Sequence, residues 1–86
     1  MAYRVAIDPS ALKQLAKLDR QIRDRVQFAI DKLAEDPRPP GCKKLKALPG
    51  YRIRVADKYR VIYEVHDAVL LVRVVKVANR GDIYDR

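Results

Sequence analysis

The stretch from Tyr51 to Tyr63 follows the period of two that half-buried strands show, and this limits the chain to folds that contain such a hairpin. Before Ala56-Asp57-Lys58, apolar residues alternate with Arg52 and Arg54, and after it they alternate with Arg60 and Ile62. A period of two places the apolar side chains on one face of each strand and the charged ones on the other. We therefore predict two antiparallel strands, 51–55 and 59–63, with one apolar face and one arginine-rich face.

The pairing register of this hairpin follows from burial of its apolar face. A three-residue connection at 56–58 places Arg54 opposite Arg60 and Ile53 opposite Val61. A two-residue connection would place Arg54 opposite Val61 and mix charge into the apolar face. Like charges directly opposite one another oppose folding by a few tenths to about 1 kcal/mol. We therefore expect Arg54 and Arg60 to be held together for an anion.

Composition limits the class of protein. The chain has 86 residues, a net charge of +8 and a pI near 9.9, so we expect one domain, 1–86, with a polyanion as its default partner. One cysteine and one histidine allow neither an intrachain disulfide nor a zinc cluster, and no metal or organic cofactor is implied. The N-terminus lacks an apolar signal core, and apolar runs such as 68–72 are too short to span a bilayer. We expect a soluble, cytoplasmic protein with no membrane partner.

Two helices are predicted before the hairpin. A short alternating strand at 3–7 ends at Asp8-Pro9, where aspartate suits an N-cap and proline the first helical position. The helix that begins near Pro9 has an apolar stripe of Leu12, Leu15 and Leu18. A second N-cap at Asp19 begins a helix over 20–35, which Pro37 ends.

The remainder of the chain completes a sheet. A stiff connection at 37–41 leads to a basic loop at 43–48, and the most apolar strand is predicted at 68–77, before a tail at 78–86. The element order is therefore β-α-α-β-β-β. We predict an α+β fold in which two N-terminal helices pack on one face of a mainly antiparallel four-stranded sheet, while its other face carries the arginines.

Several motifs resemble those of the RelE/ParE superfamily of toxins from type II toxin–antitoxin pairs. The most specific are Tyr59-Arg60-Val61-Ile62-Tyr63 and the closing Arg80-x-x-Ile83-Tyr84. The helix L-K-Q-L-A-K-L-D and the segment K-K-L-K-A-L-P-G also match, so the resemblance spans nearly the whole chain. It implies a RelE-like fold.

The resemblance implies a ribosome-dependent endoribonuclease, an mRNA interferase that cuts mRNA in the ribosomal A site. The reaction is attack of a ribose 2′-hydroxyl on the adjacent phosphate, which needs a proton acceptor, charge stabilisation and a proton donor. Carried over by position, the catalytic candidates are Arg52, Arg54, Arg60, Arg80 and Tyr84. Arg52 and Arg54 stand where relatives carry lysine, and arginine is a poor general base. Asn79 stands where many relatives carry histidine, so the proton acceptor is left open.

Other polar residues are assigned by their sequence context. We expect RNA contacts from basic residues outside the catalytic set: Lys43, Lys44, Lys46, Arg73 and Lys76. His66 is a tempting ribonuclease residue, but we predict it at the opposite end of its strand from the Arg54–Arg60 pair. Tyr51, Tyr59 and Tyr63 share the apolar face and are expected in the core.

The resemblance leaves two competing functions. A ParE-like toxin has the same fold but inhibits DNA gyrase without nuclease activity. A non-catalytic RNA-binding relative would bind RNA in a salt-dependent way and cut nothing. In the nuclease interpretation the partners are a cognate acidic, RelB-like antitoxin, the 70S ribosome with its rRNA, and the A-site mRNA.

Overall fold

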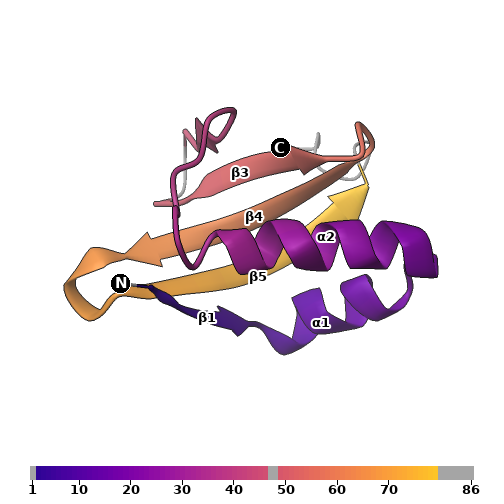
Figure 1. Ribbon diagram of the computed structural model, residues 1–86, viewed down its shortest axis with the longest axis horizontal. Coiled ribbons are helices and arrows are strands. Elements are labelled where there is room, and N and C mark those ends of the chain that lie inside the picture. The colour runs from indigo at the N-terminus through magenta and orange to yellow at the C-terminus, as the bar shows by residue number, and fades with distance from the viewer. Residues whose placement is uncertain (1, 47–48, 80–86) are drawn as a thin grey trace.

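A computed structural model describes residues 2–46 and 49–79 of the chain. The predicted Arg80 and Tyr84 lie outside these residues. The element order is β1 (Arg4–Ile7), α1 (Pro9–Ala16), α2 (Arg20–Lys32), β2 (Lys43–Lys44), β3 (Tyr51–Val55), β4 (Tyr59–His66), a 3₁₀ turn η1 (Asp67–Val69) and β5 (Leu71–Asn79). Both helices lie over the same side of the sheet (Figure 1). None of the described helices is long and apolar enough to cross a membrane.

The helices begin as their sequences predict but are shorter. Asp8 and Asp19 occupy the N-cap positions of α1 and α2, although neither carboxylate makes a capping hydrogen bond. The helix predicted over 20–35 ends at Lys32, and hydrogen bonds between residues three apart continue as turns to Glu35. In α1, Leu15 is buried whereas Leu12 is exposed, so the predicted leucine stripe is wrong at its first position.

The sheet has the strand order β1-β5-β4-β3-β2. β1 pairs with β5 in parallel, and every other neighbouring pair is antiparallel. The predicted α+β class is therefore confirmed, but the sheet has five strands rather than four. The additional strand is β2, because two residues of the predicted basic loop add to the edge of β3.

The central hairpin has the predicted register. Val55 is opposite Tyr59, Arg54 opposite Arg60 and Ile53 opposite Val61. The connection at 56–58 turns through positive φ at Ala56 and Asp57, 54° and 62°. Two consecutive residues in this region turn the chain tightly enough to keep charge out of the apolar face.

The last strand differs from its predicted bounds of 68–77. Residues 67–69 form η1, and Leu70 adopts a left-handed φ of 51° before β5 begins at Leu71. β5 also continues to Asn79, into the predicted tail. Residues 68–70, whose apolar character predicts a strand, therefore belong to the turn.

A β-bulge in β5 decides which of its side chains face the helices. Ile62 is opposite Lys76, whereas its neighbour Tyr63 is opposite Val74, so Val75 is the additional residue. The bulge reverses the alternation and places Val77, together with Val72 and Val74, in the core. Without it, Lys76 would face the helices and Val77 would face outward.

The core lies between the helices and one face of the sheet. The helices contribute the buried Ala11, Leu15, Val26 and Ile30, and Leu33 follows α2. The sheet contributes Ile53, Val55, Val61, Tyr63, Val72, Val74 and Val77. The opposite face of the sheet, which we call the outer face, carries the charged positions of the same strands.

Candidate functional site

Five basic residues come together on the outer face, which we call the cationic face: Lys43, Arg52, Arg54, Arg60 and Lys76. One cross-strand row runs Lys43, Arg52, Ile62, Lys76 over β2, β3, β4 and β5. The next row runs Arg54, Arg60, Ala78 over β3, β4 and β5. The period-2 pattern of the hairpin and the bulge in β5 together produce this grouping.

Arg54 and Arg60 are opposite one another but differ in environment. Arg60 is 5% exposed, whereas Arg54 is exposed. Both line a small depression together with Lys43 and Arg52. The depression also includes Gly41, from the loop between α2 and β2. A backbone segment with no side chain at this rim leaves room for a ligand to approach the arginines.

Four of the five charges of the cationic face are available to a ligand. Within residues 2–46 and 49–79, no ion pair engages Lys43, Arg52, Arg54 or Lys76. An unpaired surface guanidinium can bind a phosphate through two parallel hydrogen bonds. The face is therefore suited to an extended phosphodiester.

Arg73 is in a different environment from the other predicted RNA-binding residues. Its Nε and Nη2 donate to the two carboxylate oxygens of Asp8 at 2.8 and 2.9 Å, and its Nη1 is 3.5 Å from Glu64. This pairing raises the pKa of Arg73 and balances its charge. It also explains why the Asp8 carboxylate does not cap α1.

The two remaining lysines lie apart from the depression. Lys44 is opposite Tyr51, whose side chain packs against the core, and Lys46 follows in the loop. Both are exposed. They extend the positive charge along the edge strand β2 and into the loop that follows it.

His66 lies far from the depression, as its sequence position predicts. Six residues of extended β4 separate it from Arg60, which is about 20 Å. Its Nε2 is instead 2.8 Å from Glu64. Among the described residues, no group of three or more histidine, cysteine or acidic side chains is arranged to hold a metal ion.

The chemistry of the cationic face is charge stabilisation. Its arginines and lysines can bind a phosphodiester and stabilise the additional negative charge of a phosphorane-like transition state. Arginine keeps its proton, so none of the three arginines of this face is suited to act as a general base. Arg80 and Tyr84 lie outside the described residues.

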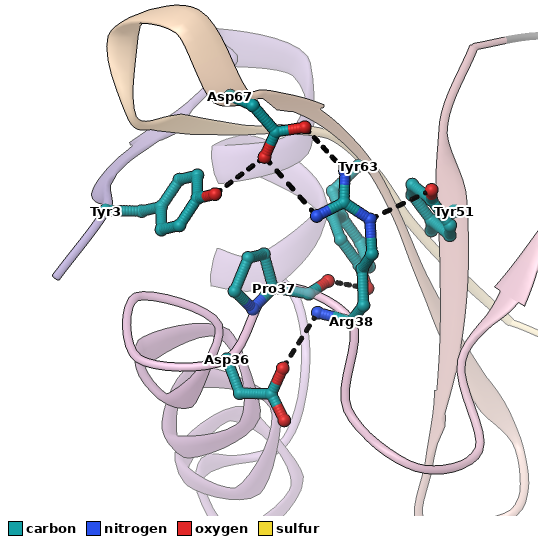
Figure 2. Close-up of polar contacts among 7 residues, drawn as sticks. All are labelled: Tyr3, Asp36, Pro37, Arg38, Tyr51, Tyr63 and Asp67. Atoms are coloured by element: carbon teal, nitrogen blue, oxygen red, sulfur yellow. Dashed lines mark hydrogen bonds and ion pairs between the residues drawn. The ribbon is translucent and has the colours of Figure 1, made fainter. Parts of the chain in front are cut away.

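Sequence patterns did not indicate one hydrogen-bonded group, which we call the Arg38 cluster: Tyr3, Arg38, Tyr51 and Asp67 (Figure 2). Arg38 donates to the Asp67 carboxylate at 2.8 and 3.3 Å and to the Tyr51 hydroxyl at 3.0 Å. The Tyr3 hydroxyl donates to the same carboxylate at 2.6 Å. These donors lower the pKa of Asp67, while the bond to Asp67 raises the pKa of Tyr3. The four residues are far apart in sequence, so no local pattern predicts their contact.

Known proteins match this chain over almost all of its length. A family model described as the ParE toxin of the type II toxin–antitoxin system parDE matches residues 5–84. The mRNA interferase toxin RelE of Escherichia coli K12 is 33% identical, over 93% of this chain and 85% of its own length.

Solved structures of toxin–antitoxin complexes match the fold. The RelE–RelB complex from the archaeon Pyrococcus horikoshii superposes with a TM-score of 0.83 at 31% identity, covering 94% of this chain and 98% of the other. The intact E. coli RelBE complex gives a TM-score of 0.79 at 32% identity, covering 90% and 95%. The matched family model, the identity and the shared fold agree with the hairpin motif, and the chain belongs to the RelE/ParE family of type II toxins.

Proposed function

We propose that this toxin is a ribosome-dependent endoribonuclease that cleaves mRNA in the A site. Its substrate is single-stranded mRNA, and the reaction is attack of a ribose 2′-hydroxyl on the adjacent phosphate. The cationic face binds the scissile region. The protein acts in the cytoplasm, where translating ribosomes are found.

The observation that carries this proposal is the pairing of Arg54 with Arg60 beside the depression. Two like charges held opposite one another oppose folding unless an anion lies between them. Arg52 and Lys43 line the same depression and are opposite one another in the neighbouring cross-strand row. The relative named mRNA interferase toxin RelE supports the same reaction class.

The proposed role of each arginine in β3 and β4 suits its position. Arg60 is buried and therefore fixed, so it stabilises the charge that develops on the phosphate. Arg54 is exposed and binds a non-bridging phosphate oxygen, and Arg52 binds a neighbouring phosphate. From the family resemblance, Arg80 adds charge, and Tyr84 stacks on a splayed base. Because arginine is a poor base, we assign removal of the 2′ proton to rRNA or water.

The second candidate function is gyrase inhibition, which the ParE description of the matching family model favours. A gyrase inhibitor binds a protein and needs no phosphate-binding depression. The grouping of five basic residues on the cationic face favours the nuclease. The third candidate function is RNA binding without catalysis, which would need the same cationic face.

The partners follow from this function. We propose a RelB-like acidic antitoxin, because RelE-like toxins of E. coli and P. horikoshii form complexes with RelB. The 70S ribosome and its rRNA are proposed to supply the rest of the binding surface. Lys44, Lys46 and Lys76 are exposed, and this supports the proposal that they contact rRNA.

The experiment is primer extension on mRNA bound to 70S ribosomes with a vacant A site. Wild type is compared with Arg54→Gln, Arg60→Gln and Tyr84→Ala, with free mRNA as the substrate control. We expect cuts that require the ribosome and are lost or reduced by roughly 100-fold in the arginine variants. Arg20→Gln, an exposed arginine at the start of α2, removes the same charge from the helix side and is the matched control.

Thermal unfolding of each variant separates loss of activity from loss of structure. This matters most for the buried Arg60. Absence of cuts by folded wild type would contradict the nuclease proposal, and inhibition of gyrase in a supercoiling assay would then establish the second candidate.

A further inference from the structure

β2 is too short for its own backbone hydrogen bonds to fix it at the edge of the sheet. It pairs with β3 only through Lys43 opposite Arg52 and Lys44 opposite Tyr51. Besides this ladder, the amide of Leu45 donates to the carbonyl of Gly50 at 2.9 Å. A two-residue edge strand contributes little stability, because few contacts offset the entropy of ordering it. Contacts outside β2 must therefore hold Lys43 at the depression.

The loop that precedes β2 provides these contacts, and Arg38 fixes the position of that loop. Arg38 contacts both carboxylate oxygens of Asp67, which begins η1 between β4 and β5 (Figure 2). It also donates to the Tyr51 hydroxyl, and its guanidinium carbon is 5.3 Å from the centroid of the Tyr51 ring. Tyr51 is the residue opposite Lys44. Arg38 is therefore bound to the same residue with which β2 pairs.

The start of the loop is fixed by two further hydrogen bonds. The buried Tyr63 hydroxyl donates to the carbonyl of Pro37 at 2.7 Å, and the amide of Arg38 donates to the Asp36 carboxylate at 3.2 Å. Tyr63 and Tyr51 also stack, with ring centroids 6.0 Å apart. These contacts connect the loop to β3 and β4 directly, and to β1 through Tyr3 and Asp67.

Only a short rigid segment separates this anchor from the cationic face. Residues 39–42 contain two prolines and Gly41, whose φ of 93° turns the chain toward β2. The amide of Cys42 donates to the carbonyl of Pro39 at 3.0 Å. Gly41 and Lys43 then both line the depression. Because the segment is short and its two prolines restrict the backbone, a fixed position of Arg38 also limits the position of Lys43.

We propose that Arg38, held by Asp67 and Tyr51, is a positioning residue that places Lys43 at the depression and thereby sets how tightly the cationic face binds an RNA phosphate. The statement about RNA rests on the proposed function. The positioning of Lys43 does not, and it is tested separately.

The first test is amide hydrogen exchange at Leu45, which reports opening of β2 without any ligand. We expect Arg38→Gln to accelerate exchange at Leu45 roughly two- to fivefold relative to the amides of β4, the range for a networked, exposed ion pair. Asp8→Asn is the matched control, because it removes the bidentate partner of Arg73 near β1, at the edge of the sheet opposite β2. An unchanged rate at Leu45 in Arg38→Gln overturns the proposal.

The second test is a double-mutant cycle on RNA affinity. A fluorescein-labelled, single-stranded RNA a few codons long is titrated with wild type, Arg38→Gln, Lys43→Gln and the double variant. If Arg38 acts through Lys43, Arg38→Gln weakens binding roughly two- to fivefold in the wild-type background and has no further effect once Lys43 is absent. A loss of stability alone would produce additive effects, which would overturn the proposal.

The same control separates this coupling from general damage. Asp8→Asn combined with Lys43→Gln is expected to show no coupling. If folded wild type binds no RNA, the proposed function and the RNA part of this proposal both fail, whereas the exchange rates at Leu45 still decide whether Arg38 positions β2.

Discussion

Arg54 and Arg60 are directly opposite each other across β3 and β4, one exposed and the other 5% exposed. Both strands extend through this pair, so backbone pairing holds two positive charges at a separation that free side chains would avoid. The helices and core on the far face stabilise the hairpin and offset this repulsion. We therefore expect the pair to attract an anion.

Replacing Arg54 with glutamine tests this arrangement. At low salt, Arg54→Gln is expected to raise the free energy of unfolding by a few tenths to about 1 kcal/mol, because the like-charge pair is removed. Sulfate is expected to stabilise wild type more than chloride does at equal ionic strength, and this excess is expected to fall in the variant. Thermal unfolding in matched salts measures both effects. An equal response of the two proteins to sulfate would contradict a preformed anion site.

Asp67 is expected to make stability depend on acid pH. Its hydrogen bonds from Arg38 and Tyr3 hold its pKa below the usual value, so the folded state favours the carboxylate. The resulting stability is present above the unfolded pKa, about 4, and is lost as pH falls through the lower folded pKa. Melting temperatures of wild type and Asp67→Asn should therefore differ at neutral pH and converge once the pH has fallen below the lowered folded-state pKa of Asp67. A gap that stays constant with pH would contradict this linkage.

Tyr63 joins the core to the loop before β2. Tyr63→Phe is expected to cost about 1–3 kcal/mol, because the buried carbonyl of Pro37 loses its donor. Burial raises the pKa of Tyr63, so this contribution is present below the unfolded pKa of about 10 and is lost as pH rises through the folded pKa. Urea unfolding at neutral and alkaline pH measures the difference. Tyr59→Phe, on the same face of the sheet, is the control and should change stability little.

Gly50 has no space for a side chain. A Cβ atom at this position would be 2.5 Å from the carbonyl oxygen of Tyr63, which is backbone and has little freedom to move. Gly50→Ala is expected to cost about 1–3 kcal/mol through overpacking. Urea unfolding compares it with Pro49→Ala at the exposed neighbouring position. Equal stability of Gly50→Ala and wild type would show that the β2–β3 connection adapts easily.

Much of the site could be predicted because the hairpin pattern is local. Alternation over 51–63 predicts the faces, and exclusion of charge from the core predicts that Arg54 is opposite Arg60. The helix N-caps at Asp8 and Asp19 are local signals of the same kind.

The features that sequence reasoning missed depend on tertiary contacts. The bulge at Val75 places Lys76 on the cationic face, and nothing in a run of valines marks which residue is additional. Arg73 is predicted as an RNA contact from its charge alone, but its ion pair with Asp8 forms only when β1 pairs with β5. Arg38 and Asp67 are likewise 29 residues apart, so their contact has no local signature.

Reversing the charge at Arg54 is expected to weaken antitoxin binding as well as toxicity. An acidic antitoxin that covers the cationic face would meet a carboxylate at the centre of its contact with β3. We expect Arg54→Glu to reduce the affinity for the cognate antitoxin at least about tenfold, mainly through faster dissociation. Calorimetric titration of the purified toxin measures this, with Arg20→Glu on the helix layer as the control for net charge. Unchanged affinity of Arg54→Glu would show that the antitoxin binds elsewhere, and a simultaneous loss of mRNA cleavage would then separate the nuclease site from the antitoxin interface.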